Sequence, residues 1–372
     1  MVSQPRRALA ALALLAALAA PARAAFVRSV MDRVDTEPLF DSEYFLDLRS
    51  FSLPRDWERA WDASTSGYRV NGASLDCCDL YTDQGLKFVR RLTAGLEFRF
   101  RFTELSDKDR QETHHWLELE QDLGRGFSAE LFGETSFRKE DADIGAGLRW
   151  RGGGWEARAR RNAVDFNFNS RGSTTERYDR KPYTDELLLA APVPGGRAWA
   201  AAEFDQPTRR RIPAQNKVFG YRRSRAWSGW EGSGDLAPRV EYAYEHQRKS
   251  DDAYHSERRV HGVTASALWG SWEPGLGFFH RSAWTELARY KRWEVQPWLR
   301  ARRELRPGLT GEVAPFLSLG EDRARLVAEA KTNLAVEWSF GGRGRIGLNG
   351  SFDLDTPNKP WDGGNVRAMF FF

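Results

Sequence analysis

Apolar and polar residues alternate with a period of two along most of the chain after residue 86. The run LTAGLEFRFRF, for example, has apolar or small residues at every second position (Leu92, Ala94, Leu96, Phe98, Phe100 and Phe102). Because successive side chains of a strand point to opposite faces, this pattern predicts β-strands with one apolar and one charged face. No helical segments of about 10 to 15 residues separate the runs, so an α/β fold is not expected.

The alternation predicts about 16 strands, within a range of about 12 to 18. Their expected bounds are residues 89–104, 113–123, 127–138, 144–151, 155–168, 183–191, 197–205, 217–230, 237–248, 257–269, 272–286, 290–304, 308–319, 323–340, 344–354 and 364–372.

The links between these strands alternate in length and character. One set is short and rich in glycine, as in GRG at residue 124, GGG at residue 152 and GGRG at residue 341. The other set is longer and charged, as in SRGSTTERYDRKP and LDTPNKPWDGG. Short turns at one rim and long polar loops at the other are typical of outer-membrane barrels. We therefore predict an all-β fold, a transmembrane antiparallel up-and-down β-barrel over residues 86–372.

Aromatic residues gather beside the short turns. The mean hydropathy of the chain is −0.62, yet the chain contains 15 Trp and 23 Phe. An amphipathic indole ring is most stable at the membrane–water interface, so aromatic residues beside the turns predict a girdle at one interface. Its expected members are Trp150, Trp155, Trp230, Trp269, Trp272, Trp338 and Phe340.

The last strand, ending NVRAMFFF, resembles the C-terminal signature of Gram-negative outer-membrane β-barrel proteins, an alternating apolar strand that ends in Phe. This resemblance implies that the barrel assembly machinery recognises the terminal Phe370 and Phe372. It also implies that the last strand closes the barrel by pairing with the first, and that the protein resides in the outer membrane, in contact with its lipid. Closure leaves no unpaired backbone groups in a solvent that cannot satisfy them.

The N-terminal residues 1–24 have the layout of a cleaved secretory signal peptide. Arg6 and Arg7 precede an apolar segment, and Ala22-Arg23-Ala24 matches an A-x-A cleavage site. Three of the 56 basic residues lie in this segment, which leaves 53 basic against 52 acidic residues. This near balance gives no basis for a nucleic-acid partner.

Residues 25–85 show no sustained alternation. They are expected to form a periplasmic extension, a plug inside the barrel, or an additional strand with a long loop, and the sequence does not choose among these. The chain's two cysteines, Cys77 and Cys78, are adjacent and cannot form a disulfide framework.

The charged faces of the strands would line the interior of the barrel. The strongest pore-lining candidates are Arg99, Arg101, Glu118, Glu120, Arg149, Arg151, Arg158, Arg160, Arg300 and Arg302. These residues could form an electrostatic constriction that orients polar solutes. They could instead form cross-strand ion pairs that make the wall rigid, which would explain most of them. Arg149, Arg151, Arg158 and Arg160 form the best basic patch, on two neighbouring strands.

The expected function is a porin-like channel for passive diffusion of small hydrophilic solutes, because about 16 strands leave room for an aqueous channel. No catalysis, cofactor or metal is expected. The first alternative is a non-conducting scaffold barrel that holds a periplasmic or surface partner. A weaker alternative is a surface hydrolase. His246, Asp251, Asp252 and His255 lie at an expected outer loop and resemble the Asp/His pairs of omptin-type proteases, although nothing else matches that family.

Overall fold

The computed structural model describes residues 57–372, except for residues 58–59, 62, 76–78, 107–110, 135–142, 164–176, 181–182, 213–216, 251–254, 286–288, 323–324, 356–357 and 359. The expected signal peptide and Cys77 and Cys78 therefore lie outside the described residues.

The described part of the chain forms a single antiparallel sheet of 19 strands. The strands are β1 (Ser66–Leu75), β2 (Asp79–Arg91), β3 (Leu96–Ser106), β4 (Gln111–Gly124), β5 (Phe127–Glu134), β6 (Ile144–Gly152), β7 (Trp155–Ala163), β8 (Arg177–Arg180), β9 (Tyr183–Val193), β10 (Gly196–Ile212), β11 (Lys217–Gly232), β12 (Arg239–Ser250), β13 (His255–Ser266), β14 (Trp272–Thr285), β15 (Arg289–Arg306), β16 (Leu309–Asp322), β17 (Arg325–Ser339), β18 (Gly344–Asp353) and β19 (Trp361–Phe371).

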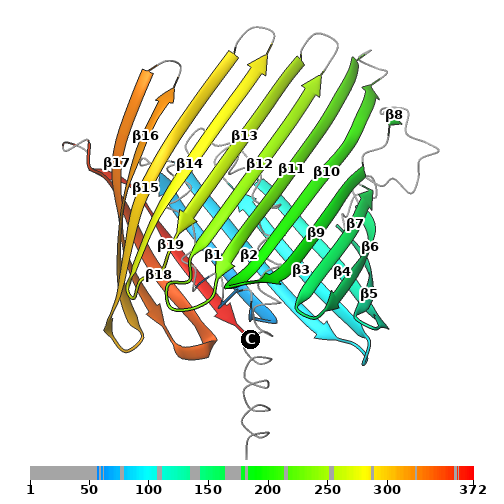
Figure 1. Cartoon of the computed structure of the whole chain (residues 1–372), viewed down its shortest axis with the longest axis horizontal. Helices are drawn as coiled ribbons and strands as arrows, with labels where there is room; N and C mark the ends of the chain where they lie inside the picture. The colour runs from blue at the N-terminus through cyan, green and yellow to red at the C-terminus, as the bar shows by residue number, and fades with distance from the viewer. Residues whose placement is uncertain are drawn as a thin grey trace, which may run out of the picture.

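The sheet closes into a barrel because β19 pairs with β1 as well as with β18 (Figure 1). In the closing ladder Tyr68 lies opposite Phe370 and Asn71 opposite Arg367. The short β8 pairs only with the loop-side end of β10, while β7 pairs directly with β9. Among the described residues the barrel wall therefore has 18 strands, which confirms the predicted antiparallel barrel and lies within the predicted range.

The barrel begins earlier than expected. Each of the sixteen predicted strands corresponds to one wall strand, from β3 to β19 with β8 left out, and the two further strands are β1 and β2. Residues 66–85 thus belong to the wall, and the expected boundary at residue 86 falls inside β2. The expected strand 89–104 is interrupted, because the chain turns between Leu92 and Gly95, where the Leu92 amide donates to the Leu96 carbonyl at 2.9 Å.

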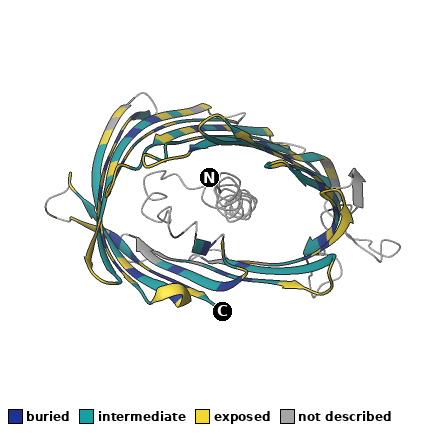
Figure 2. Cartoon of the chain, turned by 60° about the horizontal axis from the view of Figure 1, so that its bottom comes forward, coloured by how far each residue is buried: buried dark blue, intermediate teal, exposed yellow. Residues whose placement is uncertain are grey.

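Burial in the wall is inverted relative to a soluble protein. On β5 and β6 the charged Glu130 and Arg149 are 3% and 2% exposed, whereas their apolar neighbours Leu131 and Leu148 are 54% and 59% exposed. The charged side chains are covered by one another, and the apolar side chains are exposed. Figure 2 shows the ring of strands with each residue coloured by its burial. An apolar outer face around a closed polar interior is the arrangement required in lipid, so the protein is an outer-membrane barrel.

The two rims differ. One rim has tight turns such as Gly124–Gly126 and Gly153–Gly154, whose glycines adopt positive φ angles of 57° to 89° that L side chains rarely take. The C-terminus lies at this rim (Figure 1). Strands β5 to β7 have 8 to 9 residues, about the length needed to cross the membrane, whereas β15 has 18 and extends further at the loop rim. No helix among the described residues is long and apolar enough to span a membrane.

Candidate functional site

A lattice of ion pairs covers the inner wall over β3 to β7, and Arg149 on β6 lies at its centre. The Arg149 guanidinium donates to Glu120 on β4 at 2.6 Å and contacts Glu130 on β5 at 3.0 Å. Its Nε atom lies 3.4 Å from Glu156 on β7. One arginine therefore ties four strands together, because its five N–H donors can contact several carboxylates at once.

Arg160 on β7 extends the lattice across β6 to carboxylates on β5 and β4. It donates to Glu130 at 2.5 Å through Nε and to Glu118 at 2.6 Å through Nη2. The position between Arg160 and Glu130 in the strand register is Gly147. A Cβ atom at Gly147 would lie 2.7 Å from Cγ of Arg160, so the missing side chain opens the path for the guanidinium. Arg99 on β3 completes the lattice by pairing with Glu118 and Glu120.

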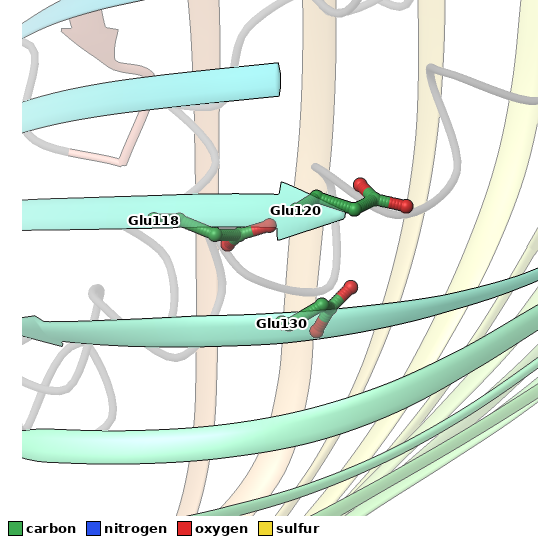
Figure 3. A group of neighbouring side chains, drawn as sticks. All are labelled: Glu118, Glu120 and Glu130. Atoms are coloured by element: carbon green, nitrogen blue, oxygen red, sulfur yellow. The ribbon is translucent and has the colours of Figure 1, made fainter. Parts of the chain in front are cut away.

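Three carboxylates converge at the middle of this lattice. Figure 3 shows Glu118, Glu120 and Glu130 on two adjacent strands, and one oxygen from each lies within 4.8 Å of the others. Such a group could hold a cation in principle. Here Arg99, Arg149 and Arg160 already donate to these same carboxylates, so the positive charge in the group is supplied by the protein itself.

The predicted basic patch is thus part of a mixed lattice. Arg149, Arg158 and Arg160 are buried, with side chains at most 3% exposed, whereas the side chain of Arg151 is 39% exposed. Arg158 lies 3.9 Å from Glu186, and Arg151 lies 3.4 Å from Glu156. Arg101 lies on β3 opposite Lys87 and Trp116. The structure therefore brings these candidates to one region of the inner wall, together with enough carboxylates to offset most of their charge.

A second lattice over β14 to β19 contains Arg300 and Arg302. Arg300 lies 3.3 Å and Arg302 3.2 Å from Glu312 on β16. Arg302 also pairs with Glu337 on β17, and Arg367 on β19 donates to Glu337 at 2.6 Å. The pore-lining candidates Arg300 and Arg302 therefore belong to a different lattice from the candidates on β3 to β7.

The second lattice binds a segment that precedes the barrel. The indole Nε1 of Trp57 donates to Glu337 at 2.9 Å, and the Arg367 guanidinium lies over its ring at 5.2 Å from the centroid. Trp61 packs on Met369, and Lys87 lies over its ring at 4.4 Å from the centroid. Trp57 is 0% and Trp61 4% exposed. Two indole rings from residues 57–61 are therefore held against the inner wall. A plug inside the barrel was one of the alternatives that the sequence left open for residues 25–85, but it did not single out these two residues.

The inner wall also has an apolar patch that sequence reasoning missed. Leu188, Ala190, Ala201 and Trp227 are buried together, and they share the inner face with Glu186 and Glu203. The run ELLLAAPV on β9 is apolar at consecutive positions, so the alternation could not assign its faces. The interrupted alternation was the sequence feature that could have revealed this patch, because a strand with apolar residues on both faces is expected to have apolar surroundings on both faces.

The predicted girdle residues lie on the outer face beside the short turns. Trp269 and Trp338 are 72% and 57% exposed, and Trp338 contacts Phe340 at 5.7 Å between ring centroids. Phe340 in turn contacts Phe370 at 5.9 Å, and Phe372 at the end of the chain is 71% exposed. The remaining members lie on β6, β7, β11 and β14 (Trp150, Trp155, Trp230 and Trp272). Their roles in membrane anchoring and assembly stay predictions.

The group considered for hydrolysis is only partly described, because Asp251 and Asp252 lie outside the described residues. His246 contacts Glu257 at 3.1 Å on the outer face, where Arg248 and Arg259 also pair with Glu257. His246 therefore belongs to a charged cluster on the outside of the barrel.

Comparison with known proteins adds structural likeness at low sequence identity. No family model and no curated protein matches the sequence. Among solved structures, the outer membrane protein opdK from Pseudomonas aeruginosa is similar over 82% of this chain and 97% of its own, at 12% identity and a TM-score of 0.47. A bacterial polysaccharide outer membrane secretin covers 83% of this chain and 99% of its own, at 10% identity and a TM-score of 0.46. OmpTdeltaL8, a loop deletion mutant of an outer membrane protein of Vibrio cholerae, is similar over 82% of this chain and 97% of its own, at 11% identity and a TM-score of 0.44.

Proposed function

We propose that this protein is a porin-like channel for passive diffusion of small hydrophilic solutes across the outer membrane. The observation that supports this is the charged inner wall of a closed barrel of 18 strands. Barrels of about 16 to 18 strands leave an aqueous channel, whereas those of about 8 strands fill their interior with side chains. A largely polar wall is also what hydrated solutes require.

The two lattices would give this channel rigid walls and weak charge selectivity. In the lattice over β3 to β7, each of the three most buried arginines lies within 4 Å of at least one carboxylate. Neutral sugars and zwitterions are therefore the expected solutes, and anion selection by the predicted basic patch would be modest. Arg151, the most exposed of that patch, is the residue proposed to interact with a passing solute.

The scaffold alternative is supported by one observation, the burial of Trp57 and Trp61 against the inner wall. A segment held there narrows the interior and could leave no passage. Proteoliposome swelling separates the two functions. We expect swelling in isotonic solutions of small sugars at a rate that falls with solute size. If a heat-modifiable, folded barrel gave no swelling with any solute, including after removal of residues 25–65, the channel proposal would be wrong.

A further inference from the structure

The outer face of β11 to β15 has a band of basic residues on the loop side of a row of aromatic and histidine residues. Cross-strand register places Tyr244, His261, His280 and Trp293 side by side on β12 to β15. Tyr244 contacts His261 at 4.9 Å, and His261 contacts His280 at 6.1 Å, between ring centroids. Below this row, toward the short turns, the outer positions are apolar, as at Val263, Phe278 and Leu276. The row therefore marks the end of the lipid-facing surface on these strands.

On β13 and β15 basic residues follow immediately on the loop side of this row, whereas the outer positions there on β14 are Ser282 and Trp284. Two positions beyond His261 lies Arg259, and two positions beyond Trp293 lies Lys291. On β12 Arg248 lies four positions beyond Tyr244, and Arg222 on β11 lies opposite Arg248 in the strand register. On β15 the next outer residue beyond Lys291 is Arg289. All are exposed, and the side chains of Arg248 and Arg259 are 54% and 51% exposed. The basic band consists of Arg222, Arg248, Arg259, Arg289 and Lys291.

Negative charge within the band is limited. Among the described residues, Glu257 is the carboxylate on this part of the outer face, and it is shared by Arg248, Arg259 and His246. On the neighbouring β16, the outer position beside Trp293 is Glu321, which accepts a hydrogen bond from the Trp293 indole at 3.0 Å. On β7 and β9, Arg161 is matched by Asp185 in a bidentate pair of 2.6 and 2.9 Å. On the described outer face of β11 to β15, the five basic residues therefore outnumber the one carboxylate, Glu257.

We propose that the basic band binds the phosphate groups of an outer-leaflet lipid, a phosphorylated glycolipid of the lipid A type. Guanidinium and ammonium groups directly beyond a membrane-interface row meet a lipid headgroup at the depth where its phosphates lie, and each such charge adds to the attraction for anionic lipid. The acyl chains of the same molecule would lie against the apolar surface on the other side of the row. A soluble anion would match the charge but not this apolar surface, so we assign the band to a lipid.

The test is a titration of the folded full chain, in detergent without divalent cations, with diphosphoryl lipid A, following bound lipid by native mass spectrometry. The test variant combines R248Q, R259Q and K291Q. The matched control combines R303Q and R306Q, exposed arginines at the short-turn end of the same strand that supplies Lys291. We expect the control to bind like the unmodified chain and the test variant to bind about tenfold more weakly or worse.

Two further arms identify the source of the phosphate. Lipid A from which both phosphates have been removed should bind the unmodified chain as weakly as diphosphoryl lipid A binds the test variant. Inorganic phosphate at millimolar concentration should not displace bound diphosphoryl lipid A. Equal binding of the test variant and the control, equal binding of the dephosphorylated lipid, or displacement by inorganic phosphate would each overturn the proposal.

Discussion

The side chain of Arg160 on β7 passes over Gly147 on β6 and donates to Glu130 on β5 at 2.5 Å. The contact therefore joins two strands that are not neighbours, and it depends on the absence of a side chain on the strand between them. The ion-pair lattice therefore depends on Gly147 as well as on its charged residues.

Gly147→Ala should destabilise the barrel by about 1 to 3 kcal/mol, the usual effect of inserting a methyl group into a filled site. The new Cβ would lie 2.7 Å from Cγ of Arg160 and 3.0 Å from the Ala159 carbonyl oxygen. The matched control is Gly342→Ala, whose Cβ would meet nothing within 4 Å. The measurement is the free energy of unfolding in vesicles by urea titration. Equal stability of the two variants would mean that Arg160 does not need this path.

Glu130→Gln should destabilise the barrel more, by about 3 kcal/mol or more, because it leaves two buried arginines with one carboxylate fewer. Glu130 accepts from Arg160 at 2.5 Å and contacts Arg149 at 3.0 Å, and its side chain is 0% exposed. Asp235→Asn, in an exposed turn, removes one carboxylate charge without touching the lattice and serves as control. A stability change below that of the control would show that water, rather than Glu130, offsets the charge of the arginines.

Trp57→Ala combined with Trp61→Ala should increase the single-channel conductance or the fraction of time that the channel is open. The two rings are held against Glu337, Arg367, Lys87 and Met369, and their removal frees the segment from the wall. Trp269→Ala, on the exposed outer face, should leave the conductance unchanged. Unchanged conductance in the double variant would mean that this segment does not restrict the passage.

Much of the fold was predictable because lipid imposes one rule on every strand. An apolar outer face and a polar inner face require alternation, and each strand from β3 onward, except the short β8, was found from it. An additional strand was only one of the alternatives for residues 25–85, because the sequence of β1, SGYRVNGASL, has Gly, Ser and Ala at several outer and inner positions. Residues 92–95 were placed inside a strand because Leu92 and Ala94 continued the period through a turn.

The lattice was predictable only in part. Alternation placed Arg149 and Glu118 on the inner face, but which arginine reaches which carboxylate depends on the register and on Gly147. The contact of Trp57 with Glu337 joins residues 280 positions apart, and no periodic pattern reports such a contact. The apolar inner patch around Trp227 was hidden because its strands have apolar residues on both faces.

Deletion of Phe372 should reduce the amount of protein assembled in the outer membrane of cells several-fold, while hardly changing the stability of protein refolded in vitro. Phe372 is 71% exposed on the barrel, so it contributes little to packing and its expected role is recognition during assembly. The check compares membrane fractions from cells with urea unfolding of refolded protein. A loss of stability in vitro equal to the loss in cells would assign Phe372 to packing instead.

The most direct test of the channel account is the conductance of the refolded chain, residues 25–372, in a planar lipid bilayer. The account predicts discrete conductance steps with a reversal potential near zero in a salt gradient, because the charges of the inner lattices largely cancel. Silence from a barrel whose folding is confirmed by heat-modifiable migration, both with and without residues 25–65, would contradict the channel and leave the scaffold function.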